Sequence, residues 1–65
     1  MKNRHDTEAT LEAHGFTQAG NVWAMGAWRV IVDSDHADVV YLDKEHGMVP
    51  RFTVEHQSFK VAEIG

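Results

Sequence analysis

Four internal glycines divide this 65-residue chain into short segments, and their spacing constrains the fold more than any other feature. Gly20, Gly26 and Gly47 separate stretches rich in β-branched and aromatic residues, a pattern typical of strands joined by tight turns. Before Gly15, residues 9–14 are mostly good helix formers. The sequence therefore predicts one helix followed by several short antiparallel strands.

The sequence also predicts how the chain is organised near its two ends. Asp6-Thr7-Glu8 is a helix start, because Asp or Thr caps free N–H groups and carboxylates are favourable at a helix N-terminus. Residues 1–5 are expected to form a flexible basic tail, and residues 6–65 a single α+β domain. Residues 58–64 fit either a short helix or a further strand, and Ser58 as an N-cap favours the helix.

Four strands are expected after the helix. The first runs from Phe16 to Ala24 with a bend at residues 19–21, and the others cover residues 27–32, 39–42 and 48–56. Pro50 has no N–H to donate, which places the last strand at a sheet edge or its start at a bulge. The predicted fold class is α+β, with the short N-terminal helix packed on one face of a four-stranded antiparallel meander.

Alternation of side chains along each strand predicts which residues face the helix. The expected core face, covered by Leu11 and Phe16, consists of Trp28, Val30, Val32, Val40, Leu42, Phe52 and Val54. The expected opposite face mixes charged and apolar residues, namely Arg29, Ile31, Asp33, Val39, Tyr41, Asp43, Val49, Arg51, Thr53 and Glu55. Such a face is either solvated or part of an interface.

Composition and missing motifs exclude several kinds of protein. The chain has no cysteine, so disulfides and thiolate metal sites are excluded. It has no apolar run near the roughly 20 residues that span a bilayer, and no signal-peptide pattern. We therefore expect a cytoplasmic protein with no membrane contact. Phosphate-binding glycine loops, dinucleotide fingerprints and nucleophile elbows are absent, so we expect neither an enzyme nor a bound cofactor.

The charges are the most informative feature for function. Ten Asp and Glu residues outnumber six Lys and Arg residues. Five of the acids fall within residues 33–45, here called the acidic segment, where Lys44 is the only base. On a hairpin they would form an acidic ribbon. Such a ribbon repels nucleic-acid phosphates and attracts basic partners, although an acidic edge also protects a sheet from aggregation.

We interpret the acidic segment as the binding surface of a small non-catalytic protein. The expected contact residues are Asp33, Asp35, Asp38, Asp43 and Glu45, with Tyr41 and Trp23 as aromatic contacts. Trp23 lies beside turns and is expected to be partly exposed, although packing over the sheet edge is the alternative. An exposed tryptophan is a good interface anchor.

The expected partner is a basic surface of a larger protein, such as a nucleic-acid-binding complex. Carboxylates would occupy the electrostatic site meant for phosphates, so no direct nucleic-acid binding is expected. Small acidic inhibitors from phages and mobile elements, including anti-CRISPR proteins, have this general character. The protein itself is expected to be a monomer or a weak dimer.

Metal binding is the first alternative for the acidic segment. Asp33 and Asp35 have the opening spacing of a calcium-binding loop, but Asp38 replaces its sixth-position glycine and Lys44 its final glutamate. No metal site is predicted. The five histidines are expected mainly at the surface, with His36 and His46 as the alternatives for a metal or acid–base role.

Two further function classes stay open. The order of helix, Gly15-Phe16 and hairpin resembles the opening of small toxins with a double-stranded-RNA-binding fold, which would imply an RNA-binding module. The chain departs from those toxins because it lacks a basic face and their glycine-serine-histidine turn. The other class is a structural homo-oligomer that hides the mixed face around Ile31, Tyr41 and Val49.

Overall fold

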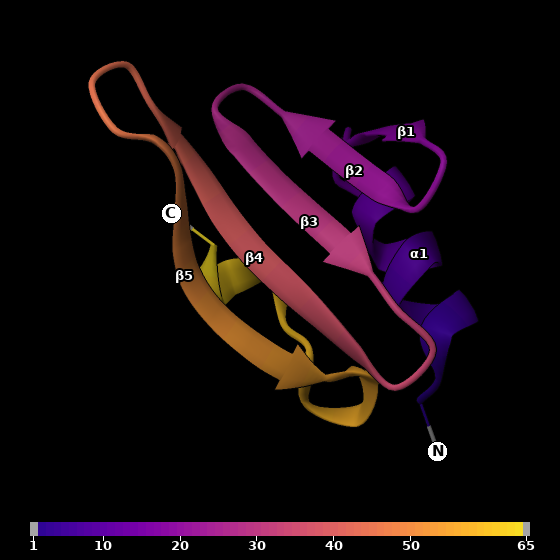
Figure 1. Ribbon diagram of the computed structural model, residues 1–65. Helices are drawn as coiled ribbons and strands as arrows, with labels where there is room; N and C mark the ends of the chain where they lie inside the picture. The colour runs from indigo at the N-terminus through magenta and orange to yellow at the C-terminus, as the bar shows by residue number, and fades with distance from the viewer. Residues whose placement is uncertain (1, 65) are drawn as a thin grey trace.

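The computed structural model describes residues 2–64. Within these residues the elements are α1 (Arg4–Ala13), β1 (Thr17–Ala19), β2 (Val22–Met25), β3 (Trp28–Val32), β4 (His36–Asp43), β5 (Gly47–Glu55) and two 3-10 helices, η1 (His56–Ser58) and η2 (Val61–Glu63). The strands form one antiparallel sheet in sequential order, β1 to β5 (Figure 1). The predicted α+β class is confirmed, whereas the strand count of four is wrong.

The extra strand arises where the sequence analysis placed a bend. Gly20 has a φ of 64°, and Ala19 pairs with Val22 across the turn that Gly20 and Asn21 make. Two-residue hairpin turns with glycine at the first central position match the twist of the flanking strands. The chain therefore reverses at Gly20, and the predicted first strand becomes the two strands β1 and β2.

The helix begins at Arg4, two residues earlier than predicted. Asn3 is its N-cap, because the Asn3 side chain accepts hydrogen bonds from the N–H groups of His5 and Asp6. The Asp6 carboxylate in turn accepts from the N–H of Asn3 at 2.8 Å, which completes a capping box. Residues 3–5 therefore belong to the folded domain and not to a flexible tail.

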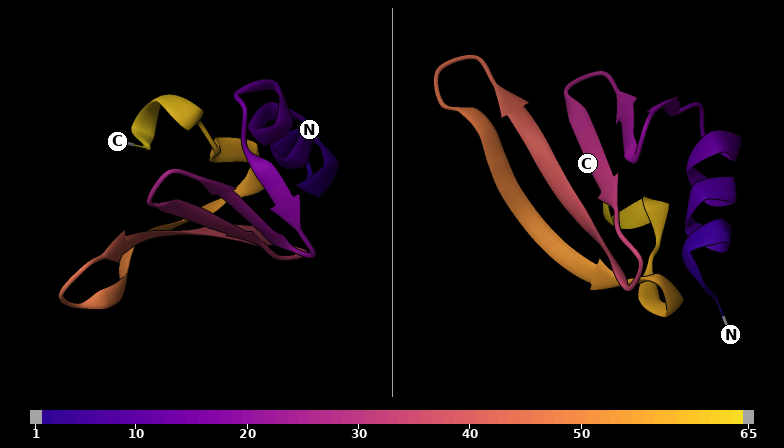
Figure 2. Two further views of the ribbon diagram at one scale, coloured as in Figure 1. Left: turned by 90° about the horizontal axis from the view of Figure 1, so that it is seen from above. Right: turned by 45° about the vertical axis from the view of Figure 1, so that its right-hand side comes forward.

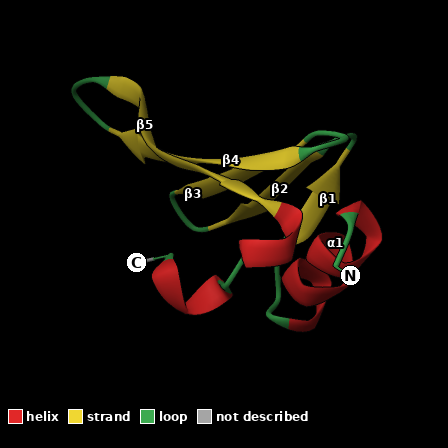
Figure 3. Cartoon of the chain, turned by 90° about the horizontal axis from the view of Figure 1, so that it is seen from below, coloured by secondary structure: helices red, strands yellow, loops and turns green. Residues whose placement is uncertain are grey.

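The helices all lie on one side of the sheet, as Figure 3 shows. The core between the two layers contains Leu11, Phe16, Trp23, Val30, Val32, Ala37, Val39 and Phe59. Trp28, Phe52 and Val54 pack against it as partly buried side chains. Nothing in residues 2–64 covers the opposite face of the sheet, which we call the open face.

The predicted faces of β4 are reversed. Strand β4 begins at His36, and the N–H of Asp33 donates to the His36 carbonyl at 2.8 Å, which closes a shorter loop than expected. The resulting register pairs Val30 with Val39 and Val32 with Ala37. Val39 and Tyr41 therefore lie on the helix side, while Val40 and Leu42 lie on the open face.

A bulge in β5 explains a second difference. Phe52 pairs with Val39 but Pro50 pairs with Val40, so Arg51 is an extra residue in this strand. The bulge changes the alternation, and Val49 lies opposite Tyr41 on the helix side instead of the predicted opposite face. The prediction that Pro50 marks an edge strand is confirmed, because β5 is the last strand of the sheet.

The C-terminal residues form helical turns and not a further strand. Residues 61–63 make the 3-10 helix η2, and Ser58 is the last residue of η1 instead of a helix cap. Phe59, between the two turns, is buried in the core. The prediction of a short helix is therefore confirmed in position, with a tighter and shorter helix than expected.

The hairpin of β4 and β5 extends well past the rest of the sheet. These strands have eight and nine residues, whereas β3 has five. Their far end projects beyond the turn between β2 and β3 and bends away from the helices (Figure 2). Residues 41–49 make up this projection, which we call the hairpin tip.

Candidate protein-binding surface

The acidic segment does not form one continuous ribbon. Asp33 and Asp35 lie in the loop before β4 and Asp38 near its start, whereas Asp43 and Glu45 lie in the hairpin tip. At about 3.3 Å per residue, β4 separates Asp38 from Asp43 by roughly 17 Å, and Asp33 and Asp35 lie farther from the tip. We call them the loop end (Asp33, Asp35 and Asp38) and the tip end (Asp43 and Glu45).

Side chains of the loop end are partly engaged in local contacts. One carboxylate oxygen of Asp33 accepts from the N–H of Ser34 at 2.7 Å. Asp38 accepts from the Thr53 hydroxyl at 2.7 Å, and His36 Nε2 lies 3.5 Å from the other Asp38 oxygen. Asp33 remains 63% exposed in its side chain, so Asp38 is the member of this group most committed to the fold.

At the tip end, the carboxylates shape the turn. Asp43 Oδ1 accepts from the N–H of Glu45 at 2.8 Å, as an Asx turn requires. Its other oxygen lies 3.7 Å from His46 Nδ1. The Glu45 carboxylate has no hydrogen bond or ion pair within residues 2–64. Both side chains therefore have oxygens that face solvent.

The protein's own cations leave the acidic segment unneutralised. Within residues 2–64, the ion pair between a Lys or Arg side chain and a carboxylate is that of Arg4 with Glu8, at 3.7 Å. The other short contacts of carboxylates involve histidine. Five carboxylates without a Lys or Arg partner produce a negative field at both ends of β4.

The two predicted aromatic contacts differ in exposure. Tyr41 is 37% exposed, and its ring packs edge to face on Trp28 with 4.9 Å between centroids. Trp23 is only 4% exposed and belongs to the core. It lies opposite Val30 on the helix side of the sheet, so the expectation of a partly exposed Trp23 is wrong.

Sequence reasoning missed the apolar side chains of the hairpin tip. Met48 is 56% exposed, the largest exposure among the large apolar residues of the described chain. Leu42, opposite Met48, is half-buried. Their position beside the Gly47 turn was visible in the sequence, but the projection of the hairpin was not.

Beside the tip lies a groove of about 470 Å³. Its lining residues come from the turn before β3 and from the hairpin tip: Ala27, Tyr41, Leu42, Asp43, Lys44 and Glu45. Three of them are apolar or aromatic, and the other three are charged. We call it the tip groove.

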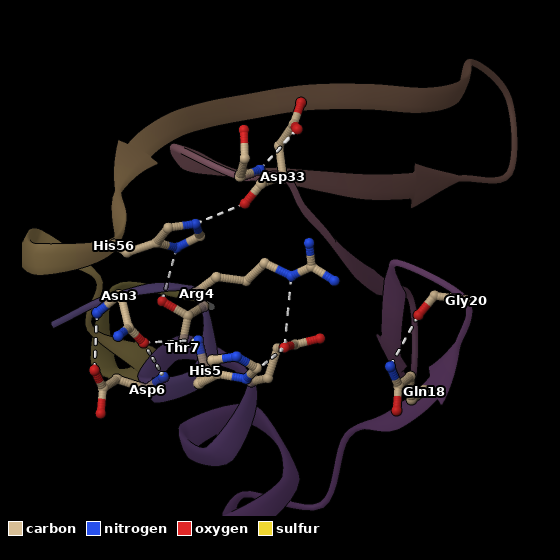
Figure 4. A network of polar contacts seen from close by, with 11 residues as sticks. Asn3, Arg4, His5, Asp6, Thr7, Gln18, Gly20, Asp33 and His56 are labelled. Carbon is tan, nitrogen blue, oxygen red and sulfur yellow. Dashed lines mark hydrogen bonds and ion pairs between the residues drawn. The ribbon is translucent and has the colours of Figure 1, made fainter.

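A buried histidine holds the loop end in place through two hydrogen bonds (Figure 4). His56 Nε2 lies 2.7 Å from the Asp33 carbonyl, and Nδ1 lies 2.9 Å from the Thr7 hydroxyl. Because a carbonyl only accepts, Nε2 carries a proton, and in the neutral ring Nδ1 accepts from Thr7. His56 and Thr7 are both buried, which corrects the expectation of a surface histidine and joins α1, η1 and the loop.

Among residues 2–64, no three or more His, Asp or Glu side chains are grouped so that they could hold a metal ion. None of the helices in this part of the chain is long and apolar enough to span a bilayer.

Comparisons with known proteins do not place the chain in a family. No family model, no curated protein sequence and no solved structure matches it. Its function must therefore be inferred from the surfaces just described.

Proposed function

We propose that this protein is a non-catalytic binding module whose acidic ends engage a basic surface of a larger protein. The observation that carries the proposal is the set of five carboxylates in the acidic segment, none of which has a Lys or Arg partner within residues 2–64. Carboxylates in solvent that are not locally neutralised attract cationic surfaces and steer their approach.

The position of the carboxylates supports a partner with an extended basic surface. Strand β4 is paired on both sides over Ala37 to Tyr41, so the sheet holds the roughly 17 Å between Asp38 and Asp43, and Asp33 and Asp35 lie farther out. A protein that normally binds nucleic acid presents cations over such a distance to match successive phosphates. We therefore propose an inhibitor that occupies a nucleic-acid-binding surface, similar in character to acidic phage and anti-CRISPR inhibitors.

Affinity capture with charge-neutral variants tests this proposal. The chain is immobilised, and proteins retained from a lysate of its native host are identified by mass spectrometry and competed with duplex DNA. The test variant changes Asp33, Asp35, Asp38 and Asp43 to Asn and Glu45 to Gln. Asn keeps the oxygen that accepts from Ser34, Thr53 or Glu45, so the local hydrogen bonds are preserved.

A matched control removes the same number of charges elsewhere. The triple variant Asp33→Asn, Asp35→Asn, Asp38→Asn is compared with Glu8→Gln, Glu12→Gln, Glu63→Gln. We expect the partner to be lost from the five-residue variant, weakened in the first triple variant and retained in the second. Equal retention by the folded five-residue variant would contradict the proposal, as would tight binding of RNA or DNA by the wild type at low salt.

The open face favours a second candidate, association of two copies of this chain. A shallow depression there is lined by the apolar Ile31, Val40 and Pro50, together with Asp38 and Arg51. A patch that carries both charges can complement itself across a twofold axis. Sedimentation equilibrium would give twice the mass of one chain, and Ile31→Lys would return it to one. A mass of one chain at all concentrations would contradict this candidate.

A further inference from the structure

We propose that the tip groove binds an arginine side chain of the partner protein. This inference rests on the proposed function and deepens it, because it assigns different roles to the two acidic ends. The tip end would recognise one arginine by shape and charge. The loop end would contribute attraction without an arginine site of its own.

The groove exists because the hairpin of β4 and β5 extends past the end of the neighbouring strand β3. Trp28 is the first residue of β3 and pairs with Tyr41, and the N–H of Leu42 donates to the Ala27 carbonyl at 2.8 Å. Beyond Leu42, β4 is paired only with β5 in the described chain. The step at Ala27 therefore leaves an open notch with the tip as one wall.

The apolar wall suits the stem of a long cationic side chain. Tyr41 is held in place by the ring of Trp28 and remains 37% exposed. Asp43 lies on the same face of β4 as Tyr41, because side chains two residues apart on a strand share a face, and Ala27 lines the groove beside them. Leu42 borders the groove from the other face of β4. Arg and Lys bury their methylene groups along such surfaces while the charged head reaches a polar environment. A small cluster of acidic residues alone would have no apolar surface for these methylene groups.

The polar wall suits the charged head. Oδ1 of Asp43 is occupied by the N–H of Glu45, but its second oxygen and the Glu45 carboxylate are available to a donor. Lys44 contributes one opposing charge, so the turn keeps a formal charge of −1. A planar guanidinium pairs with carboxylates through two parallel hydrogen bonds and also stacks on aromatic rings, which an ammonium cannot do. Arginine therefore fits better than lysine.

The cavities at the loop end suit a cation less well than the tip groove does. Asp38 borders the depression on the open face, but Arg51 lines it as well and would repel an arginine. Asp38 is already bonded to Thr53 and lies beside His36. The cavity nearest to this end, about 210 Å³, is lined by polar and charged residues that include Lys2, Asp35 and Glu55. Its one ring is that of His56, which is buried and hydrogen-bonded to Thr7 and the Asp33 carbonyl, and Lys2 adds a positive charge that would repel a cation.

Peptide titrations followed by NMR test the inference. The probes are blocked tripeptides Gly-Arg-Gly, Gly-Lys-Gly and Gly-citrulline-Gly, the last being a neutral match for arginine. We expect the arginine peptide to shift Ala27, Tyr41 and Leu42, to bind at least about threefold more tightly than the lysine peptide, and to leave Ser34 and Asp35 unmoved. No shift in the groove, or equal shifts at both ends, would overturn the inference.

Substitutions separate the contribution of the Tyr41 ring from that of the two tip carboxylates. Tyr41→Leu and the pair Asp43→Asn, Glu45→Gln should each weaken the arginine peptide by about tenfold or more. Tyr41→Phe keeps the ring and should bind like wild type, as should the control pair Asp33→Asn, Asp35→Asn. Peptide binding that survives loss of the Tyr41 ring and both tip carboxylates would overturn the inference.

The two proposals fail in different ways. If partner capture needs the acidic segment but the arginine peptide does not bind the groove, the arginine site is wrong and the proposed function stands. If the arginine peptide binds the groove but capture of the partner does not depend on the carboxylates of the acidic segment, the arginine site stands and the proposed function is wrong.

Discussion

The half of the sheet beneath the helices and the hairpin tip share the strands β4 and β5, yet the side chains of these strands differ in burial between the two regions. Near the start of β4, Ala37 and Val39 are buried under α1 and the C-terminal turns. Farther along the same strand, Tyr41 is exposed and Asp43 has no Lys or Arg partner in the described chain. The change occurs beyond Trp28, the first residue of β3, where the helices no longer cover the sheet.

This difference indicates a division of labour. In the covered half, the buried His56 is satisfied internally by Thr7 and the Asp33 carbonyl. In the tip, carboxylates and apolar side chains face solvent at a fixed position. Buried residues of the covered half should therefore determine stability, and exposed residues of the tip should contribute most to binding.

The largest expected effect is from Leu11→Ala. Leu11 is fully buried against the sheet, and truncation leaves a cavity that costs about 2–5 kcal/mol of unfolding free energy. Met48→Ala, in the exposed tip, should cost less than about 0.5 kcal/mol. Urea unfolding followed by tryptophan fluorescence measures both. Similar losses for the two variants would contradict the division between the two regions.

The next effect concerns the buried hydrogen bond of His56. Thr7→Val keeps the side-chain shape but removes the hydroxyl that donates to His56, which leaves a buried acceptor unsatisfied and costs about 1–3 kcal/mol. Thr10→Val is the control, because the Thr10 hydroxyl bonds an exposed carbonyl of the same helix. Thermal unfolding should separate the two variants. A control as unstable as Thr7→Val would assign the loss to helix propensity.

Gly47→Ala should have a smaller effect. Gly47 has a φ of 72° with open space around its Cα, so an added Cβ meets only backbone strain of about 1 kcal/mol. Gly47→Asn should cost less, since Asn tolerates this conformation. Chemical denaturation of both variants measures the difference. Equal unfolding free energies for the two variants would indicate that the backbone of the turn at Gly47 adjusts to remove the strain.

The smallest expected effect on stability is from the tip charges. The pair Asp43→Asn, Glu45→Gln keeps the turn hydrogen bond and should change the unfolding free energy by less than about 0.5 kcal/mol. Calorimetry of this variant beside Glu12→Gln, Glu63→Gln checks the expectation. A loss of more than about 1 kcal/mol would mean that the carboxylates have a structural role.

Much of the fold could be predicted because turns and strands have local signals. The glycines and β-branched stretches indicated the helix, the antiparallel strands and the edge position of Pro50. The faces of β4 could not be predicted, because Val39 and Val40 are both apolar and alternation cannot choose between them. The choice is made by the short loop closed between Asp33 and His36. Similarly, the bulge at Arg51 depends on pairing with a distant strand.

The site was predicted as a set of residues and not as a surface. The sequence identified the acids correctly as a group of charges, but the length of β4 divides them into two ends. Trp23 seemed accessible beside two turns, whereas its pairing with Val30 directs it into the core. The tip groove depends on β3 being shorter than β4, which no local pattern encodes.

A shortened hairpin tests the central claim most directly. Replacing residues 42–48 by Asn-Gly joins the paired residues Tyr41 and Val49 through a two-residue turn and removes the tip end. Unfolding free energy and partner capture are then measured on the same sample. We predict a change in stability of less than about 1 kcal/mol with loss of the captured partner. Capture at the wild-type level, or unfolding of the whole domain, would contradict the division between a covered half that folds and a tip that binds.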